Sequence, residues 1–307
     1  MFGIYFGQYL VNKGVLTLEQ YNEIISDSKS TKVKMGFLAV EEGVMTSEQA
    51  EEVNMLQQTQ DRRFGDIAIE KGYLTENQVA GLLKKQGDEY LLFVQALVDR
   101  DILSLEGIQK EINAYKKSNR FTALDIEAIK SGDIDRIVPV FTRDDSIPPL
   151  VKDYVALTAR NLVRFIDSRF QMEQIERADL YESAYMATQE LDGDYKLLTG
   201  FCGDQEGLKL IGECFIKREY AELNLEEMDI LDVLDILDAA CEFLNCNNGL
   251  YATRVSKEDV DLDMCPPEMR DFHSEIHSDG NMYKVSFYIK GKKVDLIICI
   301  QSKWKLD

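Results

Sequence analysis

The sequence predicts two domains of different fold class: an all-α module of helical repeats, followed by an α+β domain with an antiparallel sheet and long helices. Three observations predict this division. A 29-residue period runs through the first third of the chain, helix-like and strand-like segments alternate in the second half, and a charged, proline-containing stretch separates them. At 307 residues the chain is long enough for two ordinary cores. We place the repeat module at residues 1–118, a linker at 119–147 and the second domain at 148–307.

The repeat module is predicted from positions that recur every 29 residues. Fixed-period self-similarity is typical of stacked supersecondary units, and units this short fit pairs of helices. Each of four units is therefore predicted to be a short helix, a turn that ends at Gly, and a second helix with a Thr or Ser N-cap. The recurring positions are Gly7, Gly36, Gly65 and Val94, then Gly14, Gly43, Gly72 and Asp101, then Thr17, Thr46, Thr75 and Ser104.

This repeat resembles the N-terminal domain of the ATPases of type II secretion and type IV pilus assembly, in which two such units in tandem can bind cyclic di-GMP. In that family a binding unit opens with Arg and ends with Gln. The third unit keeps both residues, as Arg63 and Gln86, while the second has Lys34 and Gln57. The resemblance implies a cyclic di-GMP site in units two and three, where glycines would allow close backbone approach. Its residues would be Lys34, Gly36, Gly43, Gln57, Arg63, Gly65, Gly72 and Gln86.

A second interpretation of the repeat module stays open. Lys does not reproduce the planar guanidinium fork of Arg, and glycines at such turns commonly just end helices. On this interpretation the module docks a protein or couples the chain to another assembly.

The linker is predicted to hold one helix, near 123–130, and the second domain to begin near Ile147. Asp192-Gly193, Asp279-Gly280 and Gly291 are predicted turns between strands. The resulting order, helix, strands, two helices, strands, is that of an α+β domain. Helices are predicted over 150–170, 206–218 and 228–247, and strands over 174–178, 185–190, 195–202, 260–264, 272–276, 282–290 and 293–300.

The predicted helix 228–247 carries the strongest candidate site. Asp238, Glu242 and Asn245 stand at i, i+4 and i+7, which places two carboxylates and an amide on one helix face. Apolar residues at a 3,4 spacing give this helix a buried side. An amide suits the positioning of a water molecule, because its oxygen accepts and its nitrogen donates hydrogen bonds.

The pattern Asp, three residues, Glu, two residues, Asn resembles the signature of the chemotaxis phosphatases related to CheC, CheX and FliY. Gly249 follows the Asn closely, and Pro266-Pro267 stands about where the family has its proline. The order of elements is that of the CheX branch. CheC and FliY carry two copies of the motif, whereas the first helix here offers only Thr158 and Asn161 at that spacing. One site per chain favours the CheX branch.

The resemblance implies dephosphorylation of the aspartyl phosphate of a CheY-like receiver domain in chemotaxis or two-component signalling. In the family the Asn positions the attacking water and the acidic residue contacts a receiver lysine. Carried over, Asn245 and Glu242 take these roles and Asp238 is a supporting contact. The chain would supply no metal or cofactor, since Mg²⁺ belongs to the receiver. CheX proteins pair through sheet edges, which implies a homodimer. The alternative is a noncatalytic dimeric adaptor that binds cyclic di-GMP or a partner protein.

Composition bounds the partners and the compartment. A net charge of −20 argues against DNA, RNA and anionic membranes. Apolar runs stay below the roughly 18 residues of a membrane span. The six cysteines lie in the C-terminal half without a CxxC pair, which predicts buried, reduced thiols in a cytoplasmic protein. His273 and His277 are predicted to be packing residues rather than metal ligands.

Overall fold

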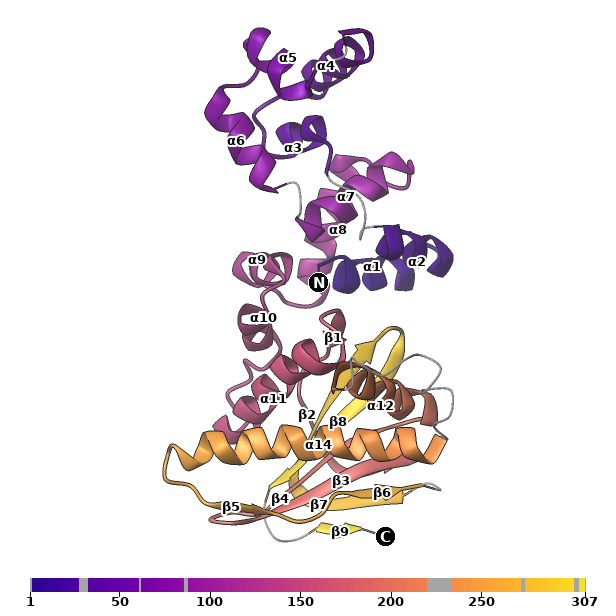
Figure 1. Ribbon diagram of the computed structural model, residues 1–307, viewed down its shortest axis with the longest axis vertical. Coiled ribbons are helices and arrows are strands. Elements are labelled where there is room, and N and C mark those ends of the chain that lie inside the picture. Colours follow the sequence, from indigo (N-terminus) through magenta and orange to yellow (C-terminus); the bar gives the residue numbers. More distant parts are fainter. Residues whose placement is uncertain are drawn as a thin grey trace. The chain divides into compact units, whose positions relative to one another are not determined.

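The computed structural model describes residues 2–27, 33–60, 62–85, 88–219, 233–271, 274–300 and 304–306. The chain divides into two units, Met1–Gly132 and Asp133–Asp307 (Figure 1). The division falls inside the segment predicted as a linker. That segment holds two helices, α9 (Ala123–Ser131) and α10 (Ile134–Phe141), where one was expected.

The first unit is helical throughout its described part (Figure 1). The first eight helices follow one another in pairs, and a residue in the left-handed region follows the first helix of each pair, at Gly14, Gly43, Gly72 and Asp101. A Gly tolerates this conformation without the Cβ clash that other residues suffer. The helices are α1 (Phe2–Asn12), α2 (Leu18–Asp27), α3 (Met35–Glu41), α4 (Ser47–Gln60), α5 (Phe64–Glu70), α6 (Glu76–Lys85), α7 (Glu89–Asp99), α8 (Leu105–Ser118) and α9.

Capping boxes start the second helix after three of these turns. Thr17 Oγ1 accepts from the Gln20 backbone N at 3.1 Å, and Gln20 Oε1 accepts from the Thr17 N at 3.0 Å. The pairs Thr46–Gln49 and Thr75–Gln78 form the same reciprocal bonds. Each box satisfies two backbone donors that a helix start leaves unpaired. The sequence positions of these helix starts therefore follow from short-range chemistry.

The second unit combines helices with one curled antiparallel sheet (Figure 1). The strand order along the sheet is β1-β7-β8-β4-β3-β5, with β2 and β9 paired to β7 and β6 paired to β3. The helices are α10, α11 (Pro149–Asn161) with a π-helical turn η1 (Leu162–Ile166), α12 (Gln205–Glu219) and α14 (Val233–Ser256). The strands are β1 (Phe170–Met172), β2 (Glu176–Ser183), β3 (Tyr185–Gly193), β4 (Leu197–Gly203), β5 (Leu262–Met264), β6 (Glu268–Arg270), β7 (Ser274–Ile289), β8 (Lys292–Ile300) and β9 (Trp304–Leu306).

One face of the sheet packs against helices. Phe243 of α14 is fully buried, and its ring stacks on Phe201 of β4 with centroids 5.2 Å apart. Phe165 and Phe215 complete this aromatic cluster. Because strand side chains alternate between faces, Gln189 of β3 points to the same side as the residues beneath α14. These contacts place α14 directly over the central strands β3 and β4.

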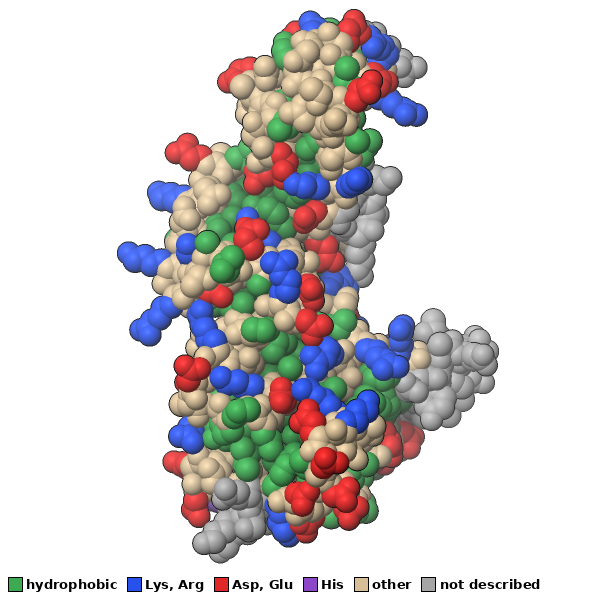
Figure 2. Space-filling view, turned by 90° about the vertical axis from the view of Figure 1, so that its left-hand side faces the viewer, with side chains coloured by type: hydrophobic (Ala, Val, Ile, Leu, Met, Phe, Trp, Pro, Cys, Tyr) green, Lys and Arg blue, Asp and Glu red, His purple; other side chains and the backbone are tan. Residues whose placement is uncertain are grey.

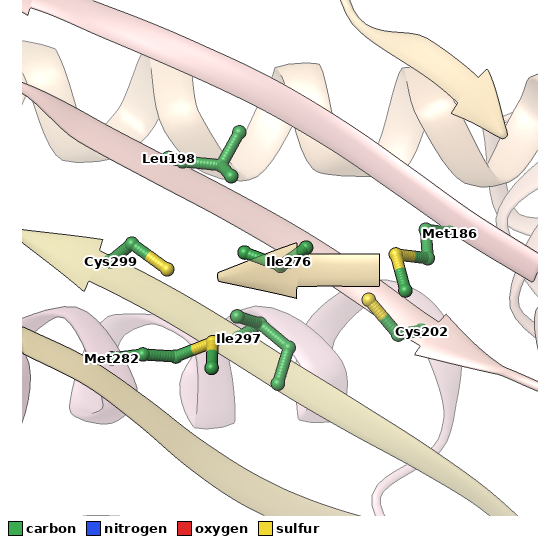
Figure 3. Close-up of a cluster of buried hydrophobic side chains, with 7 residues drawn as sticks. All are labelled: Met186, Leu198, Cys202, Ile276, Met282, Ile297 and Cys299. Atoms are coloured by element: carbon green, nitrogen blue, oxygen red, sulfur yellow. The ribbon is translucent and has the colours of Figure 1, made fainter. Parts of the chain in front are cut away.

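The opposite face of the sheet is covered by the bent start of β7. Gly280 has φ of +80° inside this strand, so the segment before it folds back over the sheet and brings Ile276 onto it. Strands β2 and β9 pair with this folded segment. Figure 3 shows the resulting cluster of buried side chains, Met186, Leu198, Cys202, Ile276, Met282, Ile297 and Cys299.

Three local expectations differ from the structure. Residues 274–276 and 282–289, predicted to lie in separate strands, belong to the single strand β7, because Gly280 bends the chain without ending the pairing. Asp192-Gly193 lies in the connection of the β3–β4 hairpin, as predicted, but this connection spans 192–196 instead of a tight turn, and both residues pair with β5. A Cβ on Gly193 would lie 2.1 Å from the Asp261 carbonyl oxygen, so this glycine serves close strand approach. The helix predicted over 150–170 is α-helical to Asn161 and π-helical to Ile166, so it ends four residues early.

The cysteines of the second unit differ in exposure, and we expect an exposed thiol to be alkylated faster than a buried one. Burial, with the nearby Asp238 and Glu242 charges, raises the pKa of the Cys241 thiol to about 12. Burial alone raises the pKa of Cys299 to about 12. A thiol with so high a pKa holds almost no thiolate at pH 8, whereas Cys265 is exposed. Brief iodoacetamide treatment of the folded protein at pH 8, followed by peptide mass spectrometry, should label Cys265 first. Equally fast labelling of Cys241 would contradict its burial.

In the described part of the chain, no helix has the length and apolar character needed to span a membrane. Figure 2 shows one face of the molecule, on which acidic, basic and apolar side chains lie interspersed.

Candidate functional site

Helix α14 presents the candidate site on its solvent side. The opposite side of this helix packs on the sheet and on α12. Its buried side chains include Ile236, Leu237, Ala240, Cys241, Phe243 and Leu244. The predicted helix began at 228, but residues 220–232 lie outside the described part of the chain. Beyond the predicted end at 247 the helix continues to Ser256. The candidate residues therefore sit near the middle of a long, regular helix.

The three predicted site residues share this exposed side. Asp238 and Glu242 are exposed, and Asn245 is half-buried. Within the residues that the structure describes, neither carboxylate takes part in an ion pair. Their negative charge acts on the neighbouring Cys241, where it adds to burial in raising the thiol pKa. The face therefore offers two hydrated carboxylates and, one turn later, an amide at the edge of the core.

Asn245 is held by a residue that the sequence analysis missed. Gln189 of β3 donates from its Nε2 to Asn245 Oδ1 at 2.8 Å and to the Cys265 carbonyl oxygen at 2.7 Å. Gln189 is only 2% exposed. A single glutamine in a strand carries no recognisable pattern, and its partner lies 56 residues away in sequence. No local signal could have assigned it to the site.

The hydrogen bonds continue from Gln189 into the core. Asn248 donates from Nδ2 to Gln189 Oε1 at 2.7 Å and to Thr199 Oγ1 at 2.9 Å. Tyr154 of α11 donates its hydroxyl to Asn248 Oδ1. We call Gln189, Asn248, Thr199 and Tyr154 the buried amide network. Networks of this kind are rigid when every member is satisfied.

The residues considered as a second copy of the motif join this interior instead of the surface. Thr158 is fully buried and Asn161 is 4% exposed. Asn161 donates from Nδ2 to Asn247 Oδ1 at 2.8 Å, and Asn247 donates from its own Nδ2 to Thr158 Oγ1 at 3.1 Å. Their hydrogen-bonding groups are thus engaged inside the unit. They present nothing to a partner protein.

Some of the residues predicted to bind cyclic di-GMP are already in contact with other side chains of the protein. A Cβ on Gly36 would lie 3.0 Å from the Phe64 ring, and one on Gly65 would lie 3.0 Å from Val79. The space beside both glycines is therefore taken by side chains of the protein. Lys34 forms an ion pair with Asp99 at 2.8 Å.

The remaining residues predicted to contact cyclic di-GMP are less enclosed. Gly43 and Gly72 adopt positive φ with open space beside them, as helix-ending glycines do. Gln57 and Arg63 are exposed. Gln86 lies outside the described residues.

Of the two histidines, His277 lies on β7, and its Nε2 is 3.0 Å from Oε2 of Glu275, two residues earlier in the same strand. His273 lies outside the described residues. Among the side chains that the structure describes, no three His, Cys, Asp or Glu residues are grouped so that they could hold a metal ion.

Solved structures that this chain is similar to include CheX-like and CheC-like chemotaxis proteins, which align with its C-terminal half. A CheX chemotaxis protein from Desulfovibrio desulfuricans is 13% identical, with 50% of this chain and 100% of that chain covered and a TM-score of 0.42. A CheC-like superfamily protein from Shewanella sp. PV-4 is 14% identical, with 50% and 97% covered and a TM-score of 0.38. A chain of the CheX–CheY–BeF3–Mg²⁺ complex from Borrelia burgdorferi is 14% identical, with 50% and 98% covered and a TM-score of 0.38. The sequence matches no protein-family model and no curated protein.

Proposed function

We propose that the second unit dephosphorylates the aspartyl phosphate of a CheY-like receiver domain. The observation that carries the proposal is the exposed face of α14, where a held amide, Asn245, follows the acidic pair Asp238 and Glu242. This face bears the acid and amide pattern that resembles the signature of the CheX branch. Its exposure on a long helix lets it reach the surface of another protein.

In this proposal the receiver brings the phosphoryl group and Mg²⁺, and the helix brings an ordered nucleophile. The barrier to hydrolysis falls when a water molecule is held in line with the phosphorus. Asn245 can hold it, because Oδ1 has a second lone pair and Nδ2 can donate to a phosphoryl oxygen. The reaction needs no covalent intermediate on this chain.

The acidic pair serves attachment. A receiver lysine beside the phosphorylation site would pair with Glu242, and Asp238 would add attraction from the preceding turn. The net charge of −20 fits a partner whose docking surface is basic. We place the protein in the cytoplasm as a homodimer joined through sheet edges, as the resemblance to CheX implies.

Phosphate release tests this function. A receiver domain charged with acetyl phosphate would be mixed with the full-length protein, and inorganic phosphate followed over time. Faster release than the receiver's own decay supports a phosphatase. Unchanged decay with receivers from several signalling systems would contradict it and favour the noncatalytic adaptor.

For the first unit we propose protein docking. Phe64 and Val79 occupy the space beside Gly36 and Gly65, and Lys34 is paired with Asp99. Isothermal titration of the full-length protein with cyclic di-GMP is therefore expected to give no binding heat. Binding heat that disappears in Arg63→Ala would overturn this expectation and restore the nucleotide site.

A further inference from the structure

The direction of the hydrogen bonds in the buried amide network is fixed by one atom that can only accept a hydrogen bond. The carbonyl oxygen of Cys265 lies 2.7 Å from the Gln189 side chain, so the Gln189 atom that faces it must be the nitrogen Nε2. Nε2 carries two hydrogens, and the second points to Asn245 at 2.8 Å. The Asn245 atom at that position must then be the oxygen Oδ1.

The other end of Gln189 is fixed in the same sense. Its Oε1 accepts from Asn248 Nδ2 at 2.7 Å. The Asn248 Oδ1 in turn accepts from the hydroxyl of Tyr154. Each amide of the network therefore has one orientation in which donors meet acceptors. Turning any of them around would set two donors or two acceptors against each other inside the core, which is costly.

Gln189 determines how Asn245 presents its amide. The side chain of Asn245 is half-buried, so one side of its amide faces the core and the other faces outward. Because Oδ1 is bound by Gln189, Nδ2 lies on the side turned away from β3. The second lone pair of Oδ1 remains free for a water molecule.

We infer that Gln189 is a positioning residue, which holds the amide of Asn245 with Nδ2 directed at the phosphoryl group and Oδ1 ready to accept from the attacking water. The catalytic meaning of this inference rests on the proposed phosphatase function. The orientation of the Asn245 amide does not, and it can be measured in the protein alone. Gln189 itself is too deeply buried to touch the receiver.

Two substitutions of Gln189 test the inference. Gln189→Met keeps the length of the side chain and removes both hydrogen bonds from Nε2. Gln189→Glu keeps the shape and replaces the donor facing Asn245 by an acceptor, so the Asn245 amide should turn and donate from Nδ2 inward. The matched control is Tyr154→Phe, which removes a hydroxyl from a fully buried residue of the same network without touching Gln189 or Asn245.

The first measurement is NMR of the full-length protein labelled with ¹⁵N in the asparagine side-chain amides. The Asn245 signal is assigned by its loss in Asn245→Ala. It should shift in Gln189→Met and Gln189→Glu and stay in place in Tyr154→Phe. An unchanged Asn245 signal in either folded Gln189 variant would overturn the inference, whether or not the wild type proves to be a phosphatase.

The second measurement separates positioning from docking. With a charged receiver, both Gln189 variants should lower kcat by about 10- to 100-fold, while KM stays near that of the wild type because Glu242 and Asp238 are intact. Tyr154→Phe should keep kcat close to wild type. An equal loss of kcat in Tyr154→Phe would show a general effect of the network and would also overturn the inference. Lack of activity in the wild type would reject the phosphatase alone and leave the NMR result to decide the positioning.

Discussion

Replacing Asn245 by alanine is expected to lower the rate of receiver dephosphorylation by about 100-fold or more. Alanine removes both the acceptor that orders the water and the donor directed at the phosphoryl group. The fold should be kept, because Asn245 is half-buried at the helix surface and the network inward of Gln189 remains bonded. The measurement is single-turnover phosphate release at saturating protein, which isolates chemistry from binding.

Glu242→Gln provides the contrast. Loss of an exposed ion pair costs about 0.2–1 kcal/mol, so this variant should weaken receiver binding by a few fold and leave the single-turnover rate at saturation nearly unchanged. The matched control is Thr253→Ala, an exposed position of α14 about two turns beyond Asn245. Wild-type activity in Asn245→Ala, or a comparable loss in Thr253→Ala, would remove the catalytic role from this helix face.

The sequence predicts the helix of the site because its signal is local. Apolar residues recur along α14 with the helical period, and this alone sets Asp238, Glu242 and Asn245 on the opposite side. The capping boxes at Thr17 and Thr46 are local in the same way. Positions a few residues apart are fixed by the geometry of one helix, whatever the rest of the chain does.

The structural partners of the site could not be predicted, because they depend on register between distant elements. Gln189 meets Asn245 only because β3 runs beneath α14 in one register. The same limit applies to Gly193, which looks like a turn residue but permits β5 to approach β3. Glycine has several uses, and only the neighbouring strand shows which one applies.

Gly212→Ala is expected to destabilise the second unit by about 3 kcal/mol. A Cβ at this position of α12 would lie 1.9 Å from the carbonyl oxygen of Ile236 in α14. This obstacle is helix backbone, which cannot turn aside as the end of a side chain can. The gain of about 1 kcal/mol in helix propensity from Gly to Ala is too small to offset the clash. Urea unfolding followed by circular dichroism of the full-length protein measures the change.

Gly249→Ala is the matched control within α14. A Cβ there would first meet the Met264 methyl group at 3.6 Å, which is ordinary contact. We expect this variant to gain about 0.5–1 kcal/mol, because alanine restricts the unfolded chain. A loss of equal size in both variants would mean that any side chain on these helices is harmful, and the specific approach of α12 to α14 would not be the cause.

The close approach at Gly212 also bears on the site. It sets how near α14 lies to α12, and both helices pack on the same strands. If alanine pushes α14 aside, the 2.8 Å bond between Gln189 and Asn245 is among the contacts that must lengthen, because β3 is held within the sheet by β4. Gly212→Ala should therefore shift the Asn245 amide signal in the protein that remains folded, whereas Gly249→Ala should leave it in place. Loss of stability in Gly212→Ala without such a shift would show that the position of α14 over β3 does not depend on α12.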